Sequence, residues 1–116
     1  MGSREMSAPQ LLVVGCSHRT TPLEVREKLA FTPEEVRGAL RMARDGKVLH
    51  ETMILSTCNR TEVYSLANDP ARAEAYVREI VTRFKGSDLL GGGPYAYAHR
   101  DEGMVRHLFR VASGLD

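Results

Sequence analysis

The stretch Val48–Leu66, VLHETMILSTCNRTEVYSL, decides the fold of this chain. Residues 48–56 and 61–66 are two extended segments rich in apolar and β-branched residues, and Cys58-Asn59-Arg60 lies between them. We interpret the segments as an antiparallel strand pair with Cys58 near its turn. The apolar run 53–55 is the buried part of the first strand, so Cys58 is expected at the strand exit, on a rigid element but outside the core.

Cys58 is therefore a candidate nucleophile. A thiol reacts as its thiolate, which a nearby cation and partial exposure favour, and Arg60 is the nearest candidate cation. A free cysteine can equally be an inert small hydrophobic residue, so these few residues leave both interpretations open. Cys16, which follows an unbroken apolar run, is interpreted as structural.

Working outward, apolar runs, helical periodicity and cap residues predict the remaining elements. The segment 11–14, closed by Gly15, is a first strand, and a loop over 17–22 leads to a short helix over 23–29. Thr32-Pro33-Glu34-Glu35 is a capping box that begins a helix ending at Gly46. Asp69-Pro70 begins a second long helix that ends at Gly86. Gly91–Pro94 breaks the chain before a short edge strand over 94–99, and Asp101 caps a last helix.

The order strand, helix, strand, strand, helix, strand is that of an α+β, ferredoxin-like split βαβ sandwich, a four-stranded antiparallel sheet with helices on one face. The closing helix is an addition. We expect residues 1–9 to be a flexible N-terminus, in part vector-derived, and residues 10–116 to form one domain.

Composition limits the function classes. The chain has 116 residues, 42% hydrophobic and 27% charged, with a net charge of +1, which excludes the overall basic field of nonspecific nucleic-acid binding. The two cysteines are too few for a disulfide framework and have no metal-site spacing. No segment approaches the roughly 18 apolar residues of a membrane span. These features predict a cytoplasmic protein without membrane or metal sites.

The other polar groups carry weaker signals. Gly91–Gly93 runs into Pro94 and lacks the spacing of a dinucleotide-binding loop, so no cofactor site is expected. For His18 and Arg19 a loop-forming role is favoured over binding. His50 and His99 have no partner at catalytic spacing and are expected to be solvated. His107 falls beside the apolar arc of the last helix, which allows either a packing or a functional role.

Three motifs together resemble glutamyl-tRNA reductase. They are Gly15–Leu29 (GCSHRTTPLEVREKL), Leu55–Tyr64 (LSTCNRTEVY) and His107–Asp116 (HLFRVASGLD), in the order and spacing of that family. The resemblance extends from Leu11 to Asp116 and implies the N-terminal catalytic domain alone. The family's NADPH-binding and dimerisation domains would then be absent from this chain.

The resemblance implies NADPH-dependent reduction of glutamyl-tRNA to glutamate-1-semialdehyde through a cysteine thioester, the first step of five-carbon tetrapyrrole (haem) synthesis. It implies Cys58 and His107 as catalytic residues and Thr57, Cys58, Asn59 and Arg60 as the substrate-binding residues, with Arg60 on the glutamate carboxylate. The full-length enzyme would be a homodimer that uses NADPH. This chain alone is expected to bind no cofactor, and to acylate or slowly hydrolyse but not to reduce.

One alternative from another class stays open. The same fold could be a noncatalytic ferredoxin-like module that docks tRNA or senses a ligand, with Cys58 passive.

Overall fold

The structure is a computed structural model that describes residues 8–86 and 95–116. Its elements, in chain order, are β1 (Gln10–Ser17), α2 (Leu23–Leu29), α3 (Pro33–Gly46), β2 (Glu51–Ser56), β3 (Arg60–Ala67), α4 (Pro70–Lys85), β4 (Tyr97–Arg100) and α5 (Glu102–Ala112). The predicted break at Gly91–Pro94 lies outside the described residues, as does most of the predicted N-terminal segment.

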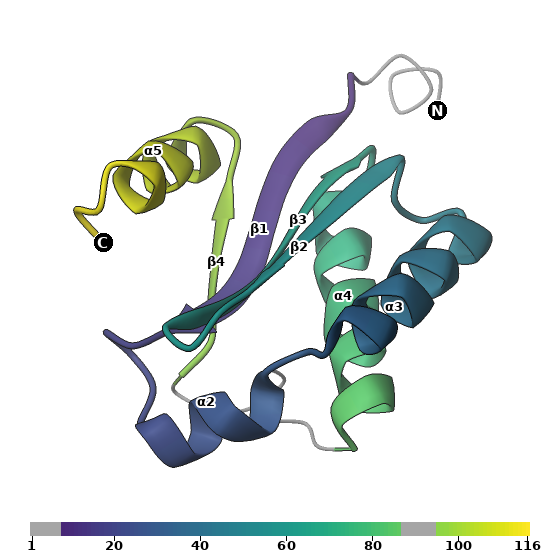
Figure 1. Ribbon diagram of the computed structural model, residues 1–116. Coiled ribbons are helices and arrows are strands. Elements are labelled where there is room, and N and C mark those ends of the chain that lie inside the picture. The colour runs from purple at the N-terminus through teal and green to yellow at the C-terminus, as the bar shows by residue number, and fades with distance from the viewer. Residues whose placement is uncertain (1–7, 87–94) are drawn as a thin grey trace.

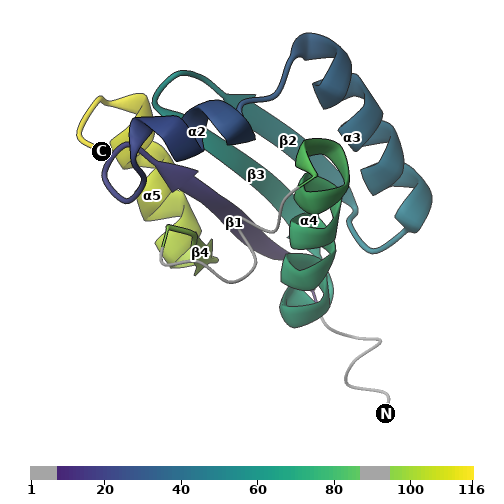
Figure 2. The same cartoon turned by 90° about the horizontal axis from the view of Figure 1, so that it is seen from below.

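The four strands form one sheet in the order β2-β3-β1-β4, and every pair is antiparallel. This order confirms the predicted α+β class and the split βαβ arrangement. Helices α3 and α4 cover one face of the sheet, α5 covers the other, and α2 lies across the end of the sheet where β1 and β2 finish (Figures 1 and 2).

The main core lies between the sheet and α3 and α4. Its fully buried side chains include Leu12, Val14 and Cys16 of β1 and Val77, Ile80 and Val81 of α4. Because successive strand residues point to opposite faces, Val13 and Tyr64 lie on the other face with Met104 of α5. The expectation that Cys16 is structural is therefore confirmed: its side chain is buried in the main core.

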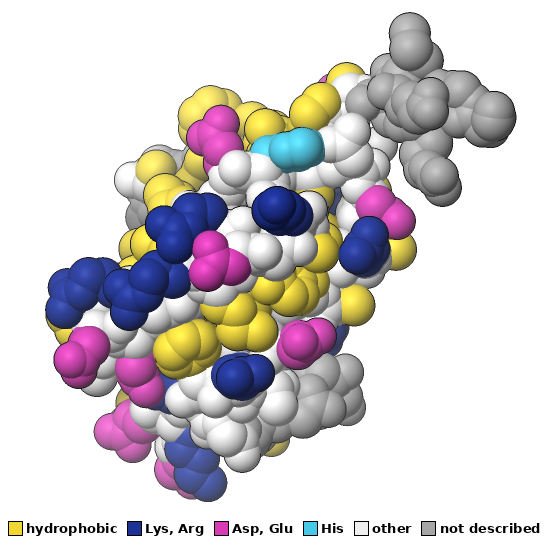
Figure 3. All heavy atoms as spheres, turned by 90° about the vertical axis from the view of Figure 1, so that its right-hand side faces the viewer, with side chains coloured by type: hydrophobic (Ala, Val, Ile, Leu, Met, Phe, Trp, Pro, Cys, Tyr) yellow, Lys and Arg dark blue, Asp and Glu magenta, His cyan; other side chains and the backbone are white. Residues whose placement is uncertain are grey.

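The outer surface of α3 and α4 carries both signs of charge. Lys, Arg, Asp and Glu side chains are all found across it (Figure 3). This mixed pattern agrees with the net charge of +1 and gives no extended field of one sign.

Helix ends follow the local sequence, with one exception. The Thr32 hydroxyl accepts from the Glu35 N–H and the Glu35 carboxylate accepts from the Thr32 N–H, which confirms the capping box. Asp69 caps α4 as predicted. Asp101 is the N-cap residue of α5, as predicted, but its side chain makes no cap hydrogen bond to the helix. Its carboxylate instead accepts from the Leu11 N–H of β1, and the residue adopts a positive φ of 50°.

Strand ends differ from the predicted ones for physical reasons. β1 continues through Gly15 to Ser17, because β3 pairs with it along this whole length. β2 begins at Glu51 rather than Val48, since Lys47 ends α3 in the left-handed conformation and the chain must then cross the end of the core. Within the described residues, no helix is long and apolar enough to cross a membrane.

Candidate active site

The turn between β2 and β3 presents Cys58 to solvent, as the sequence predicted. The Thr57 N–H donates to the Arg60 carbonyl over 2.8 Å, and the Asn59 N–H donates to the Thr57 hydroxyl over 3.1 Å. The His18 N–H, from the loop after β1, donates to the Asn59 carbonyl over 2.7 Å. The exposed thiol is thus carried by a turn whose backbone is hydrogen-bonded on both sides.

Arg26 of α2 holds the same turn from the end of the sheet. Its Nη1 donates to the Cys58 carbonyl over 2.6 Å, and its Nε donates to the Thr21 carbonyl over 3.1 Å. Because both bonds come from one rigid guanidinium, they fix the loop before α2 and the Cys58 turn relative to each other. Sequence reasoning gave Arg26 no role.

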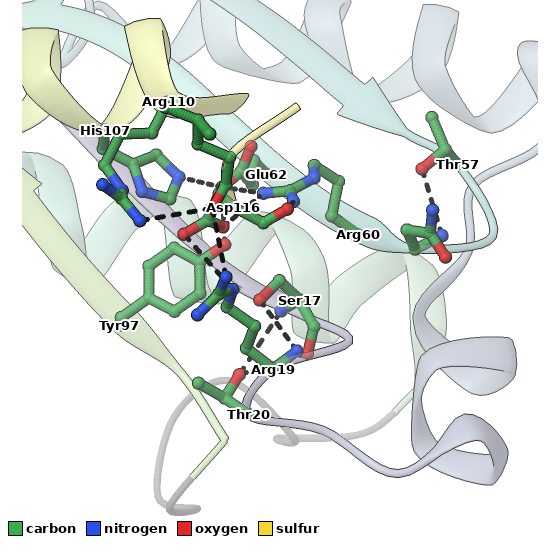
Figure 4. A network of polar contacts seen from close by, with 12 residues as sticks. Ser17, Arg19, Thr20, Thr57, Arg60, Glu62, Tyr97, His107, Arg110 and Asp116 are labelled. Atoms are coloured by element: carbon green, nitrogen blue, oxygen red, sulfur yellow. Dashed lines mark hydrogen bonds and ion pairs between the residues drawn. The ribbon is translucent and has the colours of Figure 1, made fainter. Parts of the chain in front are cut away.

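Arg60 lies at the start of β3 and its side chain is almost fully buried. Its Nη1 donates to Glu62 Oε2 over 3.4 Å and to Asp116 Oδ2 over 3.1 Å, and its Nη2 donates to the Asp116 carbonyl over 3.3 Å. Figure 4 shows the guanidinium directed toward Glu62 and Asp116, away from Thr57. The arrangement differs from the expected one, in which Arg60 is the cation beside the Cys58 thiol.

Glu62 is the centre of the polar cluster. It is fully buried, and its carboxylate accepts hydrogen bonds from Arg60, from His107 Nε2 and from the hydroxyls of Tyr64 and Tyr97. Burial, then the hydrogen bond to Glu62 and its charge, raise the pKa of both tyrosines well above the ordinary value. Both hydroxyls are therefore donors at neutral pH, and together with Arg60 and His107 they give the buried carboxylate four donors.

His107 is buried against this carboxylate. Nε2 donates to Glu62, so Nε2 carries a hydrogen and Nδ1 is the nitrogen left for other partners. The imidazole also lies near the rings of Tyr97 and His99, with centroid separations of 5.2 and 5.0 Å. His99 is half-buried and stacks on Tyr97 at 5.4 Å, so the expectation that it is solvated was wrong. Edge strand β4 brings it there.

Asp116 completes the cluster. Burial raises the pKa of its carboxyl, but the hydrogen bond from Arg60 and the charges of neighbouring cations outweigh burial, so the pKa lies below 3.8. One of these cations is Arg19, whose Nε lies 3.9 Å from Asp116 Oδ1. Arg19 and Arg110 each donate to the Leu115 carbonyl, so two guanidinium groups hold the residue that precedes Asp116.

The predicted site residues fall into two groups. Arg60 and His107, which are 47 positions apart, meet at Glu62 on the α5 face of the sheet. Thr57, Cys58 and Asn59 form the turn at the end of the sheet. Sequence reasoning missed Glu62 and Tyr97. A signal was present for Glu62: it shares a strand face with Arg60 in a strand that is otherwise apolar or neutral, and a buried pair of opposite charge at that spacing is uncommon.

The described residues contain no group of three or more His, Cys, Asp or Glu side chains placed to hold a metal ion. The sheet in residues 8–86 and 95–116 is antiparallel throughout, whereas a dinucleotide site needs a glycine-rich turn between a parallel strand and a helix. The described residues therefore do not fit NADPH.

Comparisons with known proteins agree with one another. Residues 14–116 match the family model for the N-terminal domain of glutamyl-tRNA(Glu) reductase. The chain is 43% identical over 105 residues to glutamyl-tRNA reductase of Syntrophotalea carbinolica, covering 90% of this chain and 24% of that protein. It is 44% identical over 106 residues to the Coxiella burnetii enzyme, covering 91% of this chain and 25% of that one.

A solved structure shows the same fold. Glutamyl-tRNA reductase from Methanopyrus kandleri superposes with a TM-score of 0.66 at 35% identity, over 90% of this chain and 22% of that chain. The present chain thus spans about a quarter of the length of the relatives that it matches.

Proposed function

Because the chain belongs to the glutamyl-tRNA reductase family and matches the N-terminal domain of these enzymes, we propose that Cys58 is the residue that accepts the glutamyl group from glutamyl-tRNA. The observation that carries the proposal is the exposed Cys58 thiol on a turn held by His18, Arg26 and Arg60. A nucleophile needs both features, access for the substrate and a fixed position.

The acyl transfer uses only this chain. The Cys58 sulfur attacks the ester carbonyl, the bond between the carbonyl carbon and the ribose oxygen breaks, and the ribose hydroxyl takes up the proton that the thiol has lost. The product is a glutamyl thioester. Such a thioester would accept a hydride more readily than an ester does. The described residues do not fit NADPH, so the reduction to glutamate-1-semialdehyde would use NADPH held by other parts of the full-length enzyme.

Arg60 is the proposed anchor for the glutamate side chain, and Thr57 and Asn59 of the turn are further proposed substrate-binding residues. The pairing of Arg60 with Asp116 supports the anchoring role, because Asp116 carries the same carboxylate group as glutamate. Substrate binding would replace the Asp116 carboxylate, which is 15% exposed, while the fully buried Glu62 stays in place. Glu62 would then keep the guanidinium oriented.

His107 is the second proposed catalytic residue. Its bond to Glu62 fixes the ring and leaves Nδ1 as the nitrogen that can exchange a proton with substrate. In this proposal the full-length enzyme is an NADPH-dependent homodimer in the pathway to porphyrins, with glutamyl-tRNA as its substrate.

The test is intact-mass analysis after incubation with glutamyl-tRNA. We expect one glutamyl adduct on the unmutated chain and on Cys16→Ser, and none on Cys58→Ser. His107→Asn should form the adduct more slowly. An adduct on the Cys58→Ser variant would overturn the assignment of the nucleophile.

The competing proposal is a noncatalytic tRNA-docking or ligand-sensing module. It predicts that binding of uncharged tRNA survives Cys58→Ala and weakens steeply with salt, because phosphate contacts would dominate. The catalytic proposal is favoured by the exposure of Cys58 against the complete burial of Cys16.

A further inference from the structure

A cavity of about 410 Å³ opens beside Cys58 on the α2 side of the turn. Its walls include Leu23, Arg26, Glu27 and Phe31 on one side and Thr57 and Cys58 on the other. The volume falls within the range of about 300–1,000 Å³ that is typical of small-molecule sites. Of the residues that we assign to glutamate binding, only Thr57 and Cys58 of the turn line this cavity.

The cavity and the polar cluster lie on opposite faces of the sheet. Arg60 and Glu62 point to the α5 face of the sheet, whereas Ser56 and Thr61 point to the other face, at the end of the sheet that α2 covers. There Ser56 Oγ accepts from the Phe31 N–H, and the Thr61 hydroxyl donates to the Leu29 carbonyl. Cys58 stands at the end of the sheet, between the two. A molecule that reacts at Cys58 therefore has separate space available on each side of the sulfur.

The lining of the cavity favours a neutral group over an anion. The Arg26 guanidinium already donates to the Thr21 and Cys58 carbonyls, and Glu27 adds an exposed carboxylate. A phosphate would meet that negative charge. Leu23, with 53% of its surface exposed, offers the apolar surface for a flat ring, because Phe31 is only 8% exposed and packs against Phe84. The Glu27 carboxylate and the Thr57 hydroxyl can accept hydrogen bonds from ribose hydroxyls.

We propose that this cavity binds the 3′-terminal adenosine of glutamyl-tRNA, the leaving-group side of the ester. The inference rests on the proposed function, because it assigns the two halves of that substrate to the two sides of Cys58. The glutamyl half extends toward Arg60. The adenosine half enters the cavity, and after the carbon–oxygen bond breaks it leaves with its hydroxyl restored.

Two esters with the same acyl group test the proposal. Glutamyl-adenosine carries the nucleoside, and the α-ethyl ester of glutamate does not. Leu23→Asp places a carboxylate at the rim of the cavity and should slow acylation of Cys58 by glutamyl-adenosine about tenfold or more. The same variant should leave the rate with the ethyl ester within about twofold. Phe109→Asp, at a residue 69% exposed on α5, is the matched control and should change neither rate.

Adenosine alone provides a second measurement that needs no acyl transfer. It should protect Cys58 from iodoacetamide in the unmutated and Phe109→Asp chains but not in Leu23→Asp. Equal slowing of both esters by Leu23→Asp, or absence of protection, would overturn the cavity assignment while adducts on Cys58 still support the proposed function. If neither ester forms an adduct on Cys58, the proposed function fails, and protection by adenosine then decides the cavity separately.

Discussion

The Tyr97 hydroxyl donates to the Glu62 carboxylate across a strand that lies between them. Tyr97 belongs to β4 and Glu62 to β3, and both pair with Gly15 of the intervening strand β1. A Cβ at Gly15 would lie 2.4 Å from the Thr61 carbonyl oxygen and 2.8 Å from Glu62 Cγ. The absent side chain therefore gives Glu62 its place and lets Tyr97 reach over β1.

Gly15→Ala should destabilise the fold by about 1–3 kcal/mol, since the methyl group meets backbone atoms that cannot move without disturbing the sheet. Gly103→Ala is the matched control. Its nearest contact would be His99 Cβ at 3.8 Å, and alanine favours the helical conformation there, so stability should stay equal or rise. The measurement is the urea midpoint of each variant. Equal midpoints for the two variants would contradict the close packing at Gly15.

Glu62→Ala should cost about 3–5 kcal/mol of unfolding free energy, because it removes the carboxylate that pairs with the buried His107 side chain and one of the two carboxylates that pair with the buried Arg60 side chain. Tyr64→Phe removes only one neutral donor and should cost about 0.5–1.5 kcal/mol. Chemical denaturation of both variants measures the difference. A loss of similar size in the two would mean that the cluster does not act as a charge network.

The capping box of α3 should make stability depend on pH in the acid range. The hydrogen bond from the Thr32 N–H, then that from Lys85, lowers the pKa of Glu35 below 4.5. The unfolded chain therefore binds this proton first as the pH falls, so the stabilisation is complete above the unfolded pKa and is lost as the pH passes through the lower folded pKa.

Thr32→Ala should accordingly cost about 1 kcal/mol at neutral pH. Lys85→Met removes the second of the two hydrogen bonds to the Glu35 carboxylate, and in that variant the Glu35 pKa should move up toward 4.5, which carboxyl NMR titration can follow. Glu34→Gln changes a neighbouring carboxylate for which the structure gives no such bond, and it serves as the control. A Glu35 titration unchanged by Lys85→Met would show that the bond between Lys85 and Glu35 is not formed in solution.

The two thiols should differ in whether they react with iodoacetamide while the protein is folded. Iodoacetamide should label the exposed Cys58 in the native protein, whereas Cys16, which is fully buried and whose pKa is raised by that burial, should react only as the protein unfolds. Mass analysis against time should show a single early addition, absent from Cys58→Ser. Two additions at the same rate would place Cys16 outside the core.

Arg26→Lys should loosen the Cys58 turn, since an ammonium group cannot replace the two directed bonds to the Thr21 and Cys58 carbonyls. Hydrogen exchange of the His18 amide, which bonds to the Asn59 carbonyl, should become faster. Lys28→Arg, an exchange of the same residue types at an exposed position on α2, is the control. Unchanged protection of His18 would show that Arg26 does not hold the turn.

The local sequence predicted most of the fold. Apolar alternation and periodicity gave every described element, and cap residues placed the ends of α3 and α4, because these signals depend on neighbours within a few residues. The two exceptions arise from contacts between residues that are far apart in the sequence. At Asp101 the carboxylate bonds to Leu11, 90 positions away, and at Gly15 pairing with β3 extends the strand, so distant partners outweighed local preference.

The sequence by itself determined the strand pair with Cys58 in its turn, the family of the chain, and the identity of the candidate residues. Only the tertiary structure decided that Arg60 faces Glu62 and Asp116 rather than the thiol, and that His107 and Tyr97 share the same carboxylate. The physical reason is that a buried charge must find its partners in three dimensions. Antiparallel pairing of β3, β1 and β4 brings them together across Gly15, and no local pattern encodes that contact.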